Sequence, residues 1–254
     1  MTNDKIYTLF AGVNGAGKST FFNALINEND FGFRINLDEI IRDKFNNEWS
    51  NVSAQFSAGR IAVKSISDCI KAGTSFNQET TLTGVSVISN IKKAKAERFE
   101  IHLYYVGLDS AELSLHRVNL RKAKGGHGIP EEDIARRYSK SFENLKTILP
   151  LCDKVKLYDN SKTNDFSVMS PFLSVENGII IKLDKEFPEY MKDIIEVYKK
   201  PVKLLSAPKV GMDASRKPTL EEARSRAMRK IDKGNNATLS DKFKPKRDNQ
   251  GDDR

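Results

Sequence analysis

The sequence predicts an α/β fold with a mostly parallel sheet, helices on both faces, a helical lid, a C-terminal hairpin add-on and a basic tail. Three observations lead to this prediction. Short apolar runs, rich in β-branched and aromatic residues, alternate with longer segments of helical periodicity. A glycine-rich segment of the pattern G-x-x-x-x-G-K-S joins the first run to the first helix. Most of the excess positive charge lies in the last fifth of the chain, where large apolar residues are sparse.

Five buried strands are predicted, each from a short apolar run. They cover residues 5–11, 33–36, 75–80, 100–107 and 154–159. The run EIHLYYVG at 100–107 gives the clearest strand signal. Because helical segments separate the strands, crossover connections and hence parallel pairing are expected.

Six helices are predicted between and after these strands, at 18–27, 38–45, 53–72, 81–96, 110–122 and 130–149. Gly73 ends the third helix and Pro130 lies in the first turn of the last. Two β-rich runs within 166–183 flank Asn177-Gly178, and Asn-Gly is the strongest short signal for a hairpin.

The composition is that of a soluble chain that can bury a core. Of its 254 residues 39% are hydrophobic and 30% charged, and no apolar run approaches the roughly 18 residues of a membrane span. The first residues lack the pattern of a signal peptide, so a cytoplasmic protein without membrane contact is expected. Cys69 and Cys152 lie far apart without metal-ligand spacing, which predicts two buried, reduced thiols.

The charge divides the chain into two parts. Residues 201–254 contribute +6 of the formal net charge of +8 and contain four prolines. We therefore expect a domain over 1–200 and a basic, flexible tail over 201–254. Residues 219–233 have helix chemistry but few apolar positions, so that helix would need a partner surface. Binding of nucleic acid or an acidic protein through the tail stays open.

The glycine-rich segment matches the P-loop motif in full and in its required context, after a strand and before a helix. The residues expected to bind nucleotide are Gly12, Asn14, Gly15, Ala16, Gly17, Lys18, Ser19 and Thr20. Backbone amides of such a loop cradle phosphate, the lysine reaches the β- and γ-phosphates, and the serine hydroxyl binds Mg²⁺. The sequence thus predicts a P-loop NTPase fold that binds ATP or GTP with Mg²⁺, with Ser19 as metal ligand.

Other classes of P-loop protein lack support in the sequence. No N-K-x-D, the base-reading motif of GTPases, follows a strand. The strand at 100–106 continues as Gly107-Leu108-Asp109, a poor match to the acidic strand end of an ATPase motor. No LSGGQ signature of a transporter subunit is present. The carboxylates and arginines of the chain instead favour a small kinase.

Two carboxylates and a group of arginines supply the other parts of a kinase. Asp38 follows the second strand and Glu79 ends the third, so both are expected at the sheet edge that carries the phosphate loop. Arg117 and Arg121 share a helix face within the predicted lid over 108–150. Such arginines stabilise the transferring phosphoryl group. Asp is also a favoured helix N-cap, so a capping role for Asp38 stays open.

Five segments carry a family resemblance. In chain order they are AGVNGAGKST, INLDEIIR, FNQETTLTG, HRVNLRKAKGGHGIPEEDIARRYSKSFENL and KLYDNS. Together they resemble the zeta toxin family of P-loop kinases over residues 5–162, most closely its short bacterial branch with the GGH-x-[IV]-PEEDI stretch.

The resemblance implies a role for each matching residue. Lys18 and Ser19 would be the phosphate-loop lysine and the Mg²⁺ ligand, and Asp38 the catalytic carboxylate that activates an acceptor hydroxyl. The motif Q-E-T-T implies that Glu79 and Thr80 hold the substrate. Arg117 matches the first lid arginine. The second has no clean counterpart: by alignment it falls near His127, and by reach Arg121 can serve.

The family also implies an activity and a partner. Its best-studied members phosphorylate a hydroxyl of UDP-N-acetylglucosamine with ATP or GTP and are held silent by an antitoxin protein. Three alternatives stay open for this chain. They are a kinase of another small molecule or a nucleic-acid end, a nucleotide-dependent module that binds nucleic acid or protein, and a toxin–antitoxin component.

Overall fold

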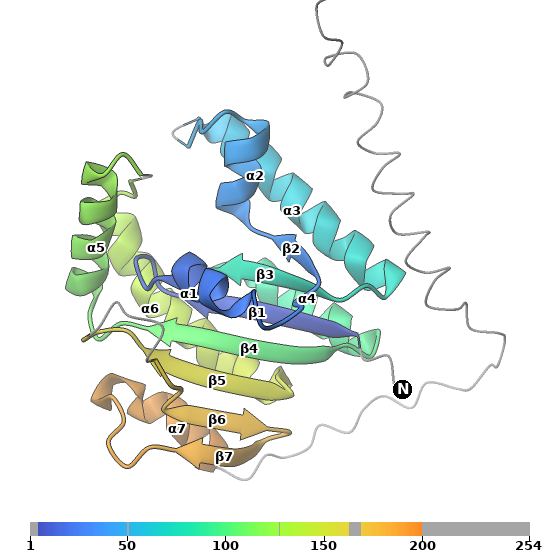
Figure 1. Ribbon diagram of the computed structural model, residues 1–254, viewed down its shortest axis with the longest axis vertical. Coiled ribbons are helices and arrows are strands. Elements are labelled where there is room, and N and C mark those ends of the chain that lie inside the picture. Colours follow the sequence, from blue (N-terminus) through green and yellow to red (C-terminus); the bar gives the residue numbers. More distant parts are fainter. Residues whose placement is uncertain (1–4, 50, 127, 163–168, 200–254) are drawn as a thin grey trace, which may run out of the picture. The chain divides into compact units, whose positions relative to one another are not determined.

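The computed structural model describes residues 5–49, 51–126, 128–162 and 169–199. Its centre is a seven-stranded sheet of order β2-β3-β1-β4-β5-β6-β7 (Figure 1). The strands are β1 (Ile6–Gly12), β2 (Phe33–Ile35), β3 (Phe76–Thr80), β4 (Glu100–Gly107), β5 (Lys154–Asp159), β6 (Leu173–Glu176) and β7 (Ile179–Leu183). The first five pair in parallel, and β6 and β7 add an antiparallel hairpin beside β5. The predicted P-loop α/β fold with a mostly parallel sheet is therefore confirmed.

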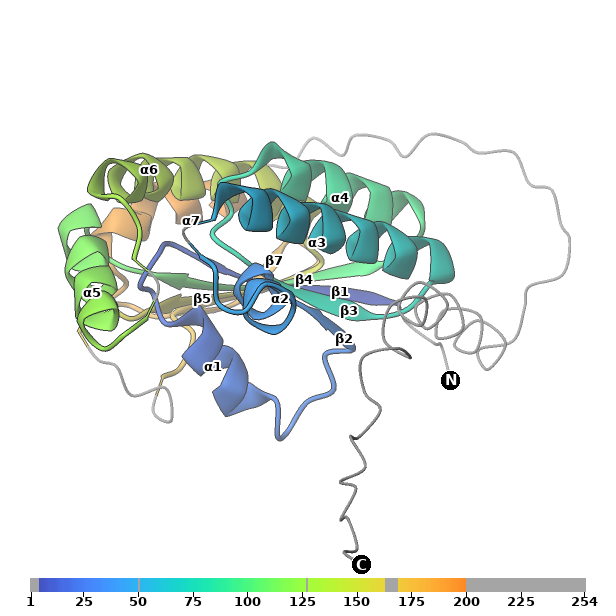
Figure 2. The ribbon, with the colours of Figure 1, turned by 90° about the horizontal axis from the view of Figure 1, so that it is seen from above.

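Helices cover both faces of the sheet (Figure 2). One face carries α1 (Lys18–Leu25). The other carries α3 (Val52–Ala72), α4 (Val85–Ala96), α6 (Glu131–Ile148) and α7 (Lys192–Lys199). The helices α2 (Leu37–Lys44) and α5 (Ala111–Ala123) lie toward the carboxyl ends of the parallel strands, where ligands bind in open α/β sheets.

Two apolar clusters fill the space between sheet and helices. The larger lies under α3, α4, α6 and α7 and includes Tyr7, Phe76 and Ile101, each fully buried. The smaller lies under α1, where Phe10 and Phe21 pack with Tyr158. Strand β1 is buried along nearly its whole length because both clusters contact it, which explains its continuous apolar sequence.

The hairpin prediction is confirmed and one helix boundary is corrected. Asn177 and Gly178, both with positive φ, form the turn between β6 and β7. The helix expected over 81–96 begins at Val85. Residues 81–84 instead form a turn, in which the Leu82 amide donates to the Thr80 hydroxyl and Leu82 itself has positive φ.

The chain between the hairpin and the tail has more structure than the sequence indicated. A short 3₁₀ helix, η2 (Glu189–Met191), and helix α7 follow β7, and no element was predicted there. Residues 163–168, His127 and the tail 201–254 lie outside the described residues, so the predicted boundary at residue 200 stays a prediction. Within the described ranges, no helix is long and apolar enough to cross a membrane.

Candidate active site

The phosphate loop joins β1 to α1 and its glycines are required by geometry. Gly12 has φ +150°, and a Cβ atom there would lie 2.2 Å from the carbonyl oxygen of Val106. Gly17, with φ 88°, is the N-cap of α1 in the left-handed conformation. The loop therefore turns the first amides of α1 toward a ligand, as anion sites at helix N-termini require.

Neighbouring elements hold this loop through its carbonyl groups. The Ser114 hydroxyl on α5 donates to the Asn14 carbonyl at 2.6 Å, and the Asn160 side-chain amide donates to the Ala16 carbonyl at 2.9 Å. Arg117, also on α5, donates to the Asn160 carbonyl at 2.7 Å. Within the described part of the chain three buried atoms near this loop have no hydrogen-bond partner: Asn14 Oδ1, Arg117 Nη1 and Asn160 Oδ1. Buried polar atoms normally have partners, so these three are available to a ligand.

Glu79 lies at the end of β3, beside the phosphate loop. Its Oε1 accepts a hydrogen bond from the Ser19 hydroxyl at 2.7 Å. Its Oε2 accepts from Arg34 at 2.7 Å and from the Asn36 side chain at 2.9 Å. Pairing order explains the placement, because β3 is the immediate neighbour of β1 and the two strands end side by side.

Asp38 lies in the first turn of α2, with its side chain exposed. The N-cap of α2 is Asn36, whose side chain accepts the backbone N–H of Asp38 at 2.9 Å. The alternative that Asp38 is itself the cap is therefore wrong, and its carboxylate is free of that role. Asn36 bonds both the Asp38 backbone and Glu79, so it fixes the two carboxylate-bearing segments relative to each other.

Lys18 interacts electrostatically with both carboxylates, Glu79 and Asp38. Its ammonium group donates to the Val13 carbonyl at 3.1 Å. Burial lowers the pKa of Lys18, nearby Glu79 and Asp38 oppose that shift, and Arg121 adds to it. The predicted groups Glu79, Asp38 and Arg121 thus each lie within electrostatic range of Lys18. Thr80, in contrast, accepts the Leu82 amide through its hydroxyl and stabilises the turn after β3.

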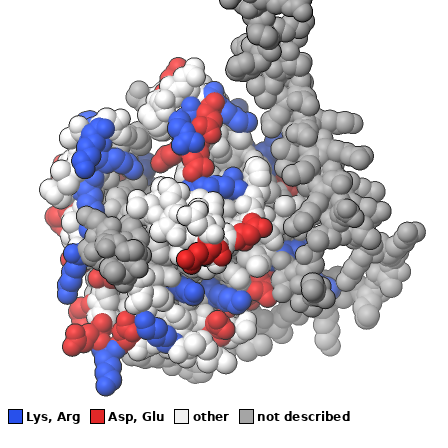
Figure 3. Space-filling model, in the orientation of Figure 1, with Lys and Arg blue, Asp and Glu red and all other residues white. Residues whose placement is uncertain are grey.

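The predicted lid consists of α5, α6 and the segment between them. Basic side chains gather where Figure 1 places α5 (Figure 3). On α6, Arg136 and Arg137 both pair with Asp133, at 2.6 Å and 3.2 Å, which engages them within their own helix. Of the lid arginines, Arg117 packs against Gly15 of the phosphate loop, and Arg121 lies within electrostatic range of Lys18. His127 cannot be placed, because it lies outside the described residues.

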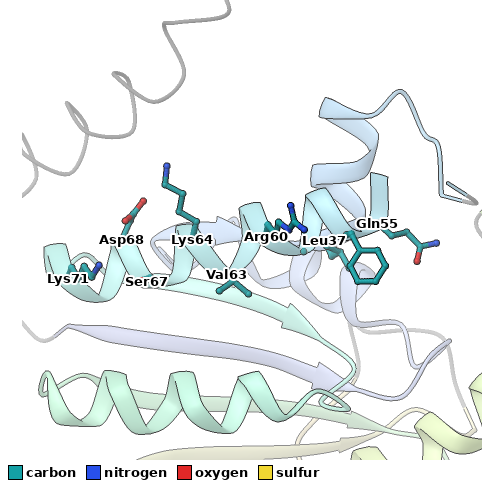
Figure 4. A pocket seen from close by; sticks show the side chains of 10 residues that line it. Leu37, Gln55, Arg60, Val63, Lys64, Ser67, Asp68 and Lys71 are labelled. Carbon is teal, nitrogen blue, oxygen red and sulfur yellow. The ribbon is translucent and has the colours of Figure 1, made fainter. Parts of the chain in front are cut away.

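A separate groove of about 780 Å³ runs along the exposed face of α3 (Figure 4). It begins at Leu37 on α2 and continues past Phe56, Arg60 and Val63 to Lys71. None of the predicted catalytic residues lines it. The groove and the phosphate loop are therefore distinct features of the described surface.

Four residues of the site were not predicted from the sequence: Arg34, Asn36, Ser114 and Asn160. Asn36 was recognisable in principle, because Asn is a favoured N-cap and immediately precedes the predicted helix. Arg34 stacks its guanidinium on Phe22, 3.6 Å from the ring centroid, while bonding Glu79 and Glu39. Nothing local in the sequence predicts those long-range contacts.

Comparison with known proteins identifies relatives of the part of the chain that carries the candidate site. The family model described as Zeta toxin matches residues 2–168. An uncharacterized protein of Haemophilus influenzae is 35% identical over 138 residues, covering 54% of this chain and 94% of that protein.

Two solved structures share the fold. One, from the PezAT chromosomal toxin–antitoxin system of Streptococcus pneumoniae, has a TM-score of 0.50 at 16% identity, covering 78% of this chain and 86% of that one. The other, a chain of AvrRxo1-ORF1:-ORF2 with ATP, has a TM-score of 0.53 at 14% identity, covering 84% of this chain and 66% of that one. At these identities the likeness concerns the fold alone.

Proposed function

The chain belongs to the zeta toxin family, and from that premise we propose that it is a kinase that transfers the γ-phosphate of ATP or GTP to a hydroxyl group of a small molecule. One observation carries the proposal. Lys18, Glu79 and Asp38 come from three separate elements, Asn36 bonds both Glu79 and the Asp38 backbone, and each carboxylate lies within electrostatic range of Lys18. Phosphoryl transfer needs a phosphate-binding lysine, a carboxylate at the metal and a carboxylate at the acceptor, and this arrangement can supply all three.

The residues around Ser19 fit a bound Mg²⁺. The Ser19 hydroxyl and the Glu79 carboxylate are hard oxygen donors, and they are already in contact at 2.7 Å. Ser19 and Glu79 would hold Mg²⁺, which would supply positive charge to the phosphates of the nucleotide. We accordingly propose that Glu79 faces the cation together with Ser19. This differs from the substrate-holding role that the family resemblance implied for Glu79.

Asp38 is proposed to act on the acceptor. Its exposed carboxylate takes the proton of the acceptor hydroxyl as that oxygen bonds to the γ-phosphorus. The bond between the γ-phosphorus and the bridging oxygen breaks, and the nucleoside diphosphate leaves with that oxygen. Lys18 and Arg121 contribute positive charge where negative charge develops on the transferring group, while Arg117 packs beside Gly15 and donates to the Asn160 carbonyl.

The finer parts of the proposal rest on the family. UDP-N-acetylglucosamine is the acceptor to test first, and an antitoxin is the partner to look for in a pull-down. We also propose that residues 1–200 form the kinase domain and that 201–254 form a separate tail.

Phosphorus NMR with Mg-ATP and UDP-N-acetylglucosamine tests the activity. A new phosphomonoester signal is expected with the wild type and not with Lys18→Ala. ADP formation without that signal would retain the kinase and exclude this acceptor. Tight ATP binding with no turnover on a panel of acceptor alcohols would contradict the proposal.

The role of Asp38 has its own test. Asp38→Ala should abolish transfer while leaving the affinity for nucleotide unchanged, because Asp38 lies on α2 and not on the phosphate loop. Loss of nucleotide affinity in that variant would contradict the assignment.

A further inference from the structure

Residues C-terminal to the family match contact the carboxyl end of the sheet, where the phosphate loop lies. The match ends at residue 168, whereas η2 and α7 cover residues 189–199. Two side chains of η2 lie against the end of β4: a Cβ atom at Gly107 would be 2.5 Å from Met191 Cε and 2.7 Å from Tyr190 Oη. This close approach brings a C-terminal addition into contact with strands that end beside the phosphate loop (Figure 1).

Tyr190 has a defined polar contact there. Its hydroxyl donates to Asp159 Oδ1 at 2.7 Å. Its ring packs edge-on against Phe142 of α6, with 5.9 Å between centroids. Burial raises the pKa of Tyr190, as does the neighbouring Asp159, so the hydroxyl keeps the proton that it donates.

The same Asp159 oxygen organises the loop after β5. It also accepts the backbone N–H of Ser161 at 3.0 Å and the Ser161 hydroxyl. The Ser161 hydroxyl oxygen in turn accepts the Asp109 amide at 2.9 Å, which ties the loop to the start of the lid. Asp159 is thus the point where Tyr190, Ser161 and the end of β5 are joined.

Asn160, between Asp159 and Ser161, is the residue of this loop that contacts the phosphate loop. It is 1% exposed, and its backbone amide donates to the Gly107 carbonyl at 3.0 Å. Its side-chain amide holds the Ala16 carbonyl, and its own carbonyl accepts from Arg117. Both Asn160 Oδ1 and Arg117 Nη1 are buried without a hydrogen-bond partner among the described residues. They are the groups that this loop leaves available to a ligand.

We propose that Tyr190 is a positioning residue of the nucleotide site, acting through Asp159 to fix Asn160 and thereby the phosphate loop and Arg117. The effect of Tyr190 on nucleotide binding rests on the proposed function, whereas its effect on the position of the phosphate loop does not. The segment that contains η2 would accordingly contribute to the nucleotide site as well as to the stability of the fold.

The variant Tyr190→Phe removes the hydroxyl and keeps the ring. Tyr198→Phe is its matched control, because Tyr198 on α7 donates only a long 3.4 Å hydrogen bond to the Leu149 carbonyl. Calorimetric titration of the full-length protein with Mg-ADP should show roughly three- to tenfold weaker binding for Tyr190→Phe, the size expected for the net contribution of one ordinary hydrogen bond. Tyr198→Phe should bind like the wild type. Ser161→Ala, which removes another donor to the same Asp159 oxygen, should weaken binding in the same direction.

Hydrogen exchange measured without nucleotide tests the positioning role of Tyr190 independently of the proposed kinase activity. Amides in 12–16 and 159–161 should exchange faster in Tyr190→Phe than in the wild type or Tyr198→Phe. If the wild type binds no nucleotide but exchange changes as expected, the proposed function fails and the positioning role stands. Unchanged exchange at both segments, or equal effects of the two tyrosine variants, would overturn the positioning role. A purely structural role would lower the melting temperature without this local pattern.

Discussion

Ser19 and Glu79, sixty residues apart in the sequence, are joined by a 2.7 Å hydrogen bond from hydroxyl to carboxylate. The bond connects the first turn of α1 to the end of β3. Arg34 and Asn36 occupy the other oxygen of Glu79, so the carboxylate is held on both sides. A carboxylate held in this way beside a phosphate-loop serine fits the cation-facing role proposed for Glu79.

Glu79→Gln should therefore weaken binding of the metal about 10- to 100-fold and leave metal-free binding of ADP nearly unchanged. Glutamine keeps the shape of the side chain and loses the charge. Titration with Mn²⁺, followed by electron paramagnetic resonance in the presence of ADP, measures the metal affinity directly. The matched control is Glu39→Gln, because Glu39 also pairs with Arg34, at 2.8 Å, but does not contact Ser19. Equal metal affinities of the two variants would contradict the proposed role of Glu79.

Asn36→Ala should lower both stability and activity. Its side chain caps α2, and loss of an N-cap costs about 1 kcal/mol. Asn51 is the equivalent cap of α3, with its side chain accepting the Ala54 amide at 3.1 Å. Asn51→Ala should thus reduce the free energy of unfolding by a similar amount, measured by urea denaturation. Only Asn36→Ala should also reduce phosphate transfer, since Asn36 alone of the two contacts Glu79 and the Asp38 backbone. Equal losses of activity would show that the effect comes from stability.

The parts of the site that the sequence predicted are those encoded locally. The phosphate loop is one continuous turn whose glycines, lysine and serine are adjacent in the chain, so its motif specifies its geometry. The carboxylates Asp38 and Glu79 were expected near the phosphate loop because parallel strands end at a common edge. Strand alternation likewise predicted the order of elements up to β5.

What the sequence could not predict depends on side chains that meet across the fold. Arg34 is one charged residue on a three-residue strand, and only the pairing of β2 with β3 brings it to Glu79. The hydrogen bond between the Thr80 hydroxyl and the Leu82 amide was not predicted, because a helix was expected over those residues. Tyr190 lies in a region with no sequence signal, 31 residues from the Asp159 that it contacts.

The two cysteines should react slowly in the native protein. Both thiols are buried and unpaired by any disulfide, and burial raises the pKa of Cys69 to about 12. Because the thiolate is the reactive form, native Cys69 should react with a disulfide reagent at pH 8 at least about 100-fold more slowly than a free thiol of pKa near 8.5. Both thiols should react at once in denaturant. Rapid reaction of either thiol in the native state would contradict the burial.

The same shift has a consequence for stability at alkaline pH. Above about pH 8.5 the unfolded chain releases the thiol protons while the folded chain retains them. The unfolded state then binds fewer protons, so the free energy of unfolding falls as pH rises from that point. Replacement of Cys69 by alanine should make this decline shallower in urea titrations between pH 8 and pH 10. An unchanged slope would argue against a raised pKa at this site.

Arg121→Ala should reduce turnover by roughly 10³-fold or more while changing the affinity for ADP little. Arg121 lies in the last turn of α5, within electrostatic range of Lys18, and its positive charge lowers the pKa of that lysine. The two cations repel each other in the free protein, and negative charge that develops on the transferring group offsets this repulsion, so their joint effect is expected to be largest in the transition state. Arg136→Ala is the control: its side chain is 66% exposed, pairs with Asp133 on its own helix, and should change turnover little. Single-turnover measurements with Mg-ATP and the identified acceptor separate the two variants. If Arg121→Ala weakened ADP binding as much as it slowed transfer, the arginine would bind the ground state, and the second lid position would have to be sought elsewhere on the lid.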